Sequence, residues 1–164
     1  MRFTDSRVYD APPSEVWAVV SDPDLYAEVA PNLSRVEVLD GEGEGMVREC
    51  ADTDGNAWQE TCTRWEPERG YAVTVHVPES EFHRRLFHTF TGEWNVTETD
   101  EGVRVTMTFK YDPRYGPVGW LLGRLLEREA TGLTAAIFDG WEQALRERGA
   151  LATATGATAG AADG

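Results

Sequence analysis

The sequence predicts an α+β fold in which a curved, seven-stranded antiparallel sheet wraps around one long C-terminal helix. Apolar residues recur every three or four positions between Pro117 and Arg148, which is the spacing of one face of a helix. The preceding residues are rich in short segments in which apolar and polar side chains alternate, which is typical of strands. A curved sheet around one helix leaves a hollow between them, and we expect the functional site there.

The first strand is expected at residues 2–10, followed by two short helices. The first helix begins around Ser14, a residue suited to cap it, and the second opens at Asp22 and stops before Pro31. Turn residues then separate six further alternating segments. These segments are Ser34–Asp40, Met46–Asp52, Ala57–Trp65, Tyr71–Val77, Leu86–Thr97 and Val103–Tyr111.

The long helix follows a break in the sheet at residues 112–117. Its apolar stripe consists of Leu122, Leu126, Ala130, Leu133, Ile137, Trp141 and Ala144. We expect one ligand-binding domain over residues 1–148, since a chain of 164 residues is long enough to bury a substantial core. Residues 149–164 form an Ala/Thr/Gly tail that we expect to be disordered.

The charge and the apolar content exclude several classes of partner. A net charge of −14, with Lys110 as the only lysine, argues against nucleic-acid binding, which depends on neutralising phosphates. The acidity suits either a high-salt host or a GC-rich genome. No apolar run approaches the roughly 18 residues of a membrane span, and we expect no signal peptide after Met1. Cys50 and Cys62 are expected to be free thiols in a reducing cytoplasm.

The turns between the strands predict which residues pair. A tight turn at Asp54–Gly55 would place Glu49 opposite Glu60 and Ala51 opposite Trp58. A turn at 66–69 would place Cys62 opposite Val73, and a turn at 100–101 would place Trp94 opposite Met107. The predicted inner face contains Val47, Ala51, Trp58, Val73, Val75, Val77, Phe90, Trp94, Val105, Met107 and Phe109. The polar residues predicted to share that face are Glu49, Glu60, Cys62, Arg64, His88 and Tyr111.

The segment from Ala11 to Tyr26 (APPSEVWAVVSDPDLY) and the Trp65–Arg69 turn (WEPER) carry a family resemblance. The chain resembles the polyketide cyclase/dehydrase group of the START-like, or SRPBCC, helix-grip superfamily, which includes the birch-pollen allergen and coenzyme Q-binding proteins. The resemblance covers residues 1 to about 148. It implies a deep cavity between sheet and helix that accepts an apolar or aromatic ligand. It implies no catalytic set, because members of the superfamily include cyclases, lipid carriers, hormone receptors and co-chaperones.

Glu49, Glu60 and His88 are the candidate catalytic residues. Two adjacent carboxylates on an apolar face would favour one raised pKa, as a general acid or base requires. The alternatives are a wet cavity mouth, neutralisation by Arg64, or an inverted face that makes both ordinary surface acids. His88 is either a catalyst or a hydrogen-bonded core residue. His83, in the polar 78–85 connection, belongs either to a lid or to a loop without a role.

The candidate ligand-binding residues are Trp58, Cys62, Arg64, Val75, Phe90, Trp94, Met107, Phe109, Tyr111, Leu126 and Leu133. We expect a carrier or sensor of a hydrophobic or aromatic small molecule. The first alternative is a cyclase or dehydratase that uses the cavity carboxylates, and the second is a protein-binding module that works through its outer sheet. We expect no cofactor and no metal, since the three histidines are scattered. The sequence leaves the oligomeric state open.

Overall fold

The computed structural model describes the backbone of residues 1–151 and every side chain in that range except those of residues 120, 122, 123, 125 and 126. The predicted tail lies outside this range from residue 152 onward. The elements are β1 (Arg2–Tyr9), α1 (Pro13–Val20), α2 (Pro23–Val29), β2 (Leu33–Asp40), β3 (Val47–Asp52), β4 (Ala57–Glu66), β5 (Gly70–Val75), α3 (Glu81–Leu86), β6 (Phe87–Thr99), β7 (Gly102–Pro113) and α4 (Gly116–Glu147).

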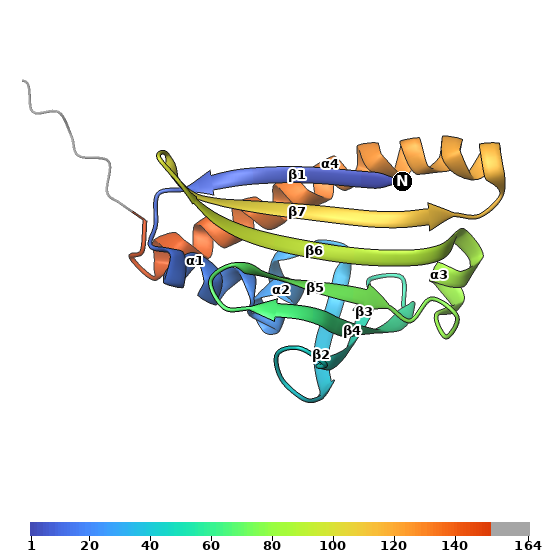
Figure 1. Cartoon of the computed structure of the whole chain (residues 1–164), viewed down its shortest axis with the longest axis horizontal. Helices are drawn as coiled ribbons and strands as arrows, with labels where there is room; N and C mark the ends of the chain where they lie inside the picture. The colour runs from blue at the N-terminus through green and yellow to red at the C-terminus, as the bar shows by residue number, and fades with distance from the viewer. Residues whose placement is uncertain (152–164) are drawn as a thin grey trace, which may run out of the picture.

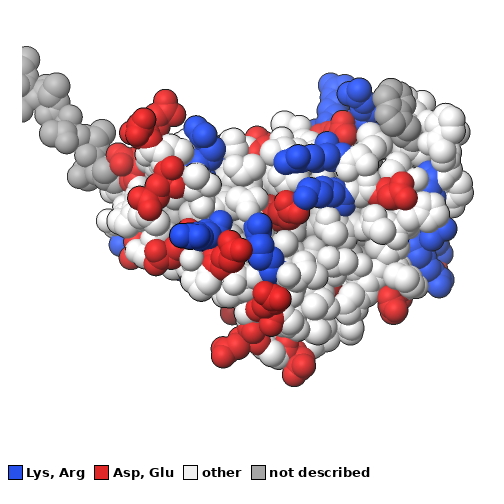
Figure 2. Space-filling model, in the orientation of Figure 1, with Lys and Arg blue, Asp and Glu red and all other residues white. Residues whose placement is uncertain are grey.

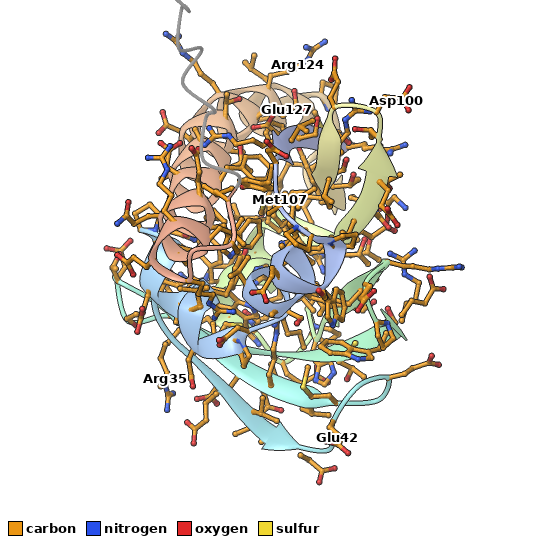
Figure 3. All side chains as sticks on the ribbon, turned by 90° about the vertical axis from the view of Figure 1, so that its left-hand side faces the viewer. Arg35, Glu42, Asp100, Met107, Arg124 and Glu127 are labelled. Carbon is orange, nitrogen blue, oxygen red and sulfur yellow. The ribbon has the colours of Figure 1, made fainter. Side chains whose placement is uncertain are left out.

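The seven strands form one antiparallel sheet in the order β1-β7-β6-β5-β4-β3-β2, which confirms the predicted fold class. Helix α4 runs along the sheet, with α1 and α2 toward one end and α3 at the other (Figure 1). The view in Figure 3 shows the sheet curling around the space beside α4, with Met107 between the two layers. Within the described residues, no helix is both long and apolar enough to cross a membrane.

The two short helices begin where proline fixes the backbone. Pro12 rather than the expected Ser14 is the N-cap of α1, and Pro13 occupies the first helical position, where a missing N–H costs nothing. The Asp22 side chain caps α2 by accepting hydrogen bonds from the backbone N–H groups of Asp24 (3.0 Å) and Leu25 (3.1 Å).

The C-terminal half of α4 packs into the core as its apolar stripe predicts. Ile137 and Trp141 are fully buried, whereas the stripe residues Leu122 and Leu126 lie outside the described side chains. Gly140 allows α2 to pack closely, because a Cβ atom there would lie 2.5 Å from Val29. Thr134 fixes the helix to β1 by donating a hydrogen bond of 2.6 Å to the Asp5 carboxylate.

The predicted register of the β3–β4 hairpin is wrong by one residue. Asp52 pairs with Asn56 around a three-residue loop, in which Gly55 has φ 88°, instead of a two-residue turn at 54–55. Arg48 therefore lies opposite Glu60, and Cys50 lies opposite Trp58. A shift of one residue turns every β3 side chain to the other face of the sheet. The β6–β7 hairpin has the predicted pairs, such as Trp94 with Met107. The β4–β5 hairpin has the predicted pair Cys62 with Val73, but a bulge between Cys62 and Arg64 then shifts the pairing, so Arg64 lies opposite Ala72 and leaves the predicted inner face.

A second departure occurs before β6. Residues 81–86 form the helix α3, where a polar connection was expected, and the Ser80 hydroxyl caps it by accepting the backbone N–H of His83 at 3.3 Å. A bulge at His88 shifts the pairing between Phe87 and Thr89. Phe87 is therefore buried, and His88 points to solvent.

Candidate functional site

A cavity of about 500 Å³ lies between the inner face of the sheet, α3 and α4. The sheet supplies most of its wall, α3 closes one side, and α4 contributes Glu127, Glu129, Ala130 and Leu133. Its apolar lining residues include Leu33, Trp58, Val73, Val75, Phe82, Leu86, Phe87, Phe90, Trp94 and Phe109. The volume falls within the range of about 300–1,000 Å³ that is usual for small-molecule sites.

Aromatic rings make up much of the cavity wall. Trp94 stacks on Tyr71 with ring centroids 4.7 Å apart, and Phe109 meets Trp94 edge to face at 5.9 Å. Gly92 makes room for this arrangement, because a Cβ atom there would lie 2.7 Å from the Trp94 ring. The wall therefore presents rigid, flat surfaces of the kind that pack against planar or polyunsaturated molecules.

Arg48 and Glu60 form a buried ion pair in this wall, on neighbouring strands. They are 3% and 5% exposed, and Arg48 Nε donates a hydrogen bond to Glu60 Oε1. The guanidinium carbon lies 5.7 Å from the centroid of Tyr71 and 5.9 Å from those of Tyr26 and Trp94. Burial opposes the charge of Arg48, yet the Glu60 carboxylate raises the pKa of the guanidinium above its usual value. The result is a fixed polar group within an apolar wall.

Cys50 shares the Glu60 carboxylate. Its thiol donates to Glu60 Oε1 at a distance of 3.6 Å between sulfur and oxygen. Burial, and then the nearby carboxylate, raises the pKa of the thiol well above its usual range. Cys50 is therefore a neutral hydrogen-bond donor in the wall and not a nucleophile.

His83 reaches the cavity from α3. Its Nδ1 lies 2.9 Å from the Ser80 hydroxyl, which already accepts the His83 backbone N–H. The hydroxyl proton is thus free to be donated to Nδ1, which places the imidazole proton on Nε2. Burial lowers the pKa of His83 to about 4, although the charges of Glu60 and Asp52 oppose this effect. The ring is therefore neutral at pH 7, and it packs edge to face on Trp58 at 5.0 Å.

Carboxylates occupy the rim of the cavity. Asp52 and Asp54 contribute from the β3–β4 hairpin, and Glu127 and Glu129 from α4. Tyr111 donates a hydrogen bond of 3.3 Å to Glu127. Burial and this carboxylate together raise the pKa of Tyr111 to about 12, so its hydroxyl stays protonated. No group of three or more His, Cys, Asp and Glu side chains in the described part of the chain is arranged to hold a metal ion.

Most of the predicted site residues lie around this cavity. Those that line it are Trp58, Glu60, Val75, Phe90, Trp94, Phe109, Tyr111 and Leu133. Cys62 and Met107 are buried in the core. The Arg64 side chain donates to Asn95 at 2.6 Å, away from the cavity lining. Leu126 lies outside the described side chains.

Glu49 and His88 do not reach the cavity. The shifted register turns Glu49 to the outer face of the sheet, where it pairs with Arg35, which Figure 3 shows on the outside. The bulge turns His88 outward in the same way. The expected pair of inward carboxylates is thus replaced by one carboxylate, Glu60, and one arginine, Arg48.

Sequence reasoning missed Arg48, Cys50, Tyr26 and His83 as cavity residues. The segment from Asp52 to Asn56 is compatible with a three-residue loop as well as with a two-residue turn, and only the first brings Arg48 inward. Ser80 followed by Glu81 was the available signal for the helix that carries His83.

Comparison with known proteins identifies relatives of this fold. The model of the family described as "Polyketide cyclase / dehydrase and lipid transport" matches residues 1–146. TTHA0849 from Thermus thermophilus is 20% identical, with a TM-score of 0.71 over 90% of this chain and 99% of that one. ZhuI aromatase/cyclase from Streptomyces sp. R1128 is also 20% identical, with a TM-score of 0.71 over 92% and 99% of the two chains.

A further relative is a two-domain protein. StfQ, a di-domain aromatase/cyclase from the steffimycin biosynthetic pathway, is 16% identical, with a TM-score of 0.72 over 90% of this chain and 51% of that one. At these identities the similarity shows the fold alone. None of the curated proteins matches the chain in sequence.

Proposed function

Because the chain belongs to the polyketide cyclase/dehydrase and lipid transport family, we propose that it binds a hydrophobic or aromatic small molecule in the cavity, as a carrier or sensor. A lipid, an isoprenoid or a polyketide-like molecule would suit the site. The observation that carries the proposal is a cavity of about 500 Å³ with a largely aromatic wall and a few fixed polar groups. We take residues 1–148 as the ligand-binding unit, and we propose a cytoplasmic location, which suits the two free, buried cysteines.

The cavity chemistry favours a ligand that is mostly apolar and carries one or two hydrogen-bonding groups. The rings of Trp58, Phe90 and Trp94 offer contact area, and Arg48 and His83 offer N–H donors to an oxygen of the ligand. The rim carboxylates would repel an anionic molecule at the entrance. A neutral molecule that is mostly apolar and carries an oxygen atom would pack on the rings, accept these hydrogen bonds and avoid repulsion at the rim.

Fluorescence titration with the neutral probe N-phenyl-1-naphthylamine tests the proposal. Val75→Trp should abolish probe binding, because Val75 is 6% exposed and lines the cavity. Thr74→Trp is the matched control, since its side chain lies on the opposite face of the same strand and should leave binding unchanged. Native mass spectrometry of protein purified from its own host would give the mass of a natural ligand. A wild-type protein that fails to bind the probe would contradict the proposal.

The second candidate function is cyclisation or dehydration of a polyketide. The buried Arg48–Glu60 pair favours it, because a buried ion pair contributes little to stability and is better explained by an action on a ligand. In this reaction Glu60 would act as general acid or base, while His83 would donate a hydrogen bond to a carbonyl oxygen; Tyr111 could do so in place of its hydrogen bond to Glu127. Glu49 and His88 have no place in it, since both point away from the cavity.

Product analysis on a linear poly-β-ketone would separate an enzyme from a carrier. The enzyme hypothesis expects cyclised or dehydrated products with wild-type protein and a large loss with Glu60→Gln. Glu49→Gln is the control, because it removes a carboxylate from the outer face of the same hairpin. Thermal unfolding of both variants would show whether any loss comes from instability. Products formed equally by both variants would exclude Glu60 as the acid or base.

A further inference from the structure

Exposed apolar side chains gather at the end of the molecule where α3 and the start of α4 lie (Figure 1). Among the described side chains, six large apolar residues are exposed, and four of them belong to these two elements and the connection between β7 and α4. Tyr115, Val118 and Leu121 are 66%, 62% and 59% exposed, and Phe82 of α3 is 38% exposed. The spacing of three residues places Val118 and Leu121 on neighbouring turns of α4. Apolar side chains that cluster in this way indicate an interaction surface.

Arginines surround a surface hollow beside these residues. Arg84, Arg85 and Arg114 line it, together with His88 and Tyr115. Figure 2 shows blue side chains gathered at this end of the molecule. Tyr115 belongs both to the hollow and to the exposed apolar group, so the two features form one continuous surface. We call Arg84, Arg85, Arg114, Tyr115, Val118 and Leu121 the docking patch.

Two of these arginines have no acidic partner in the part of the chain that the structure describes. Among the described residues, neither Arg84 nor Arg114 forms an ion pair, although acidic residues outnumber basic ones by 29 to 15 in the chain. Arg114 donates through Nε to the Phe87 carbonyl at 3.0 Å, which fixes its guanidinium at the hollow. Arg85 pairs with Glu81, but both side chains are about two-thirds exposed, and such a pair is readily exchanged for an external anion.

We propose that the docking patch binds the surface of an anionic phospholipid bilayer. Guanidinium groups would pair with lipid phosphates, while Tyr115, Val118 and Leu121 would enter the boundary between headgroups and acyl chains. Acidic residues more than about 10 Å from the patch are screened at physiological salt, so the net charge of −14 acts on this contact only weakly. Close to the patch, Glu81 on α3 and Asp112 beside Arg114 oppose the contact, but the three arginines outnumber them. A bilayer provides phosphates and apolar chains together, which fits the patch better than a protein partner does.

The docking patch lies next to the ligand cavity, because α3 contributes residues to both. Phe82 and Leu86 of α3 line the ligand cavity, and Arg84 and Arg85 of the same helix line the hollow. A protein docked through this patch would hold α3, one wall of its cavity, against the bilayer. An apolar ligand could then pass between membrane and cavity without crossing water, a consequence that rests on the proposed ligand-binding function. The membrane contact itself does not depend on any ligand.

Sedimentation with vesicles tests the proposal on the full-length protein. We expect binding to vesicles of phosphatidylcholine with phosphatidylglycerol, weaker binding to phosphatidylcholine alone, and loss of binding at high salt. Arg84→Gln/Arg85→Gln and Val118→Ser/Leu121→Ser should each lower the partition coefficient roughly tenfold or more. All four residues are exposed, so the fold should survive, and thermal unfolding would verify this.

The matched control is Val38→Ser/Leu39→Ser, which removes the other two exposed apolar side chains, on β2, and should leave binding unchanged. Three results would overturn the proposal. They are no sedimentation with anionic vesicles, equal losses for the control and the patch variants, or binding that is insensitive to both salt and the arginine substitutions. Probe binding in the cavity is measured without vesicles, so a failure here stays distinct from a failure of the ligand-binding function.

Discussion

Arg48 and Glu60 face each other across β3 and β4 and form an ion pair that is almost completely buried. Their attraction must offset the cost of removing two charges from water, so the pair adds little to stability when it is intact. The energetic consequence appears when one partner is lost, because the remaining charge has no counterpart inside the protein.

We predict that Arg48→Met lowers the free energy of unfolding by about 3–5 kcal/mol, since it leaves the Glu60 carboxylate buried without its partner. The double variant Arg48→Met/Glu60→Leu should recover much of this loss, because it removes both charges. Urea denaturation of the wild type and both variants would measure these differences. A double variant as unstable as the single one would contradict this account.

The Arg35–Glu49 pair on the outer face of the same strands is the control. Its side chains are 50% and 26% exposed, and pairs of this kind typically contribute less than about 1 kcal/mol. Arg35→Met should therefore change the unfolding midpoint only slightly.

A pH dependence follows from His83. Its pKa is about 4 in the folded protein and near 6.5 when unfolded, so the unfolded state binds more protons between these values. Above pH 6.5 His83 is neutral in both states, and its titration takes nothing from the stability of the folded protein. As the pH falls from 6.5 toward 4, protonation of His83 in the unfolded state lowers the free energy of unfolding. The full size of this effect is about 3 kcal/mol, as the difference between the two pKa values requires. Urea denaturation at several pH values should show wild type losing more stability than His83→Asn over this window.

His88→Asn provides the comparison for this measurement, because His88 is exposed and makes no contact with the cavity. Its pH profile should follow that of the wild type. Identical profiles for His83→Asn and the wild type would mean that His83 is not held neutral by the fold.

The order of the seven strands and of α1, α2 and α4 was accessible from the sequence because hydrophobic periodicity and proline positions indicate it, whereas α3 was missed. Alternation in the strands and the stripe of Ile137 and Trp141 follow from one-sided burial, whereas proline marks the start of the two short helices because its fixed φ suits the first helical position. The residues that line the cavity from β4 to β7 were predicted for the same reason. Trp58, Val75, Phe90, Trp94 and their neighbours alternate in step with the predicted pairs Cys62–Val73 and Trp94–Met107, which the structure contains.

The polar residues of the cavity wall were harder to predict from the sequence, because single-residue irregularities in the strands decide which side chains point inward. One extra residue in the 53–55 loop exchanges Glu49 for Arg48 in the cavity wall, and one bulged residue turns His88 outward. Both errors reverse the direction of a side chain without changing the strand that carries it. The hydrophobic pattern of the sequence fits a two-residue loop and a three-residue loop equally well. The prediction of Glu49 as a catalytic residue depended on the two-residue loop, and the structure has the other.

Ser80 links the capping of α3 to the position of His83. Its hydroxyl accepts the His83 backbone N–H and contacts the imidazole Nδ1. Ser80→Ala should cost about 1 kcal/mol as the loss of an N-cap and should speed amide hydrogen exchange within α3. Asp22→Ala removes the equivalent cap from α2 and should leave exchange in α3 unchanged. Unaltered exchange in α3 after Ser80→Ala would show that the cap does not hold this helix.

Gly92 and Gly132 should respond in opposite ways to the same substitution. A Cβ atom at Gly92 would lie 2.7 and 2.8 Å from two ring carbons of Trp94, whose indole is held by stacking on Tyr71. Gly92→Ala should therefore destabilise the protein by about 1–3 kcal/mol and weaken probe binding, because the displaced indole lines the cavity. Gly132 lies on the exposed side of α4 with open space around it, so Gly132→Ala should raise stability by up to about 1 kcal/mol. Thermal unfolding and probe titration would measure both effects, and a neutral Gly92→Ala would mean that the Trp94 ring is free to move.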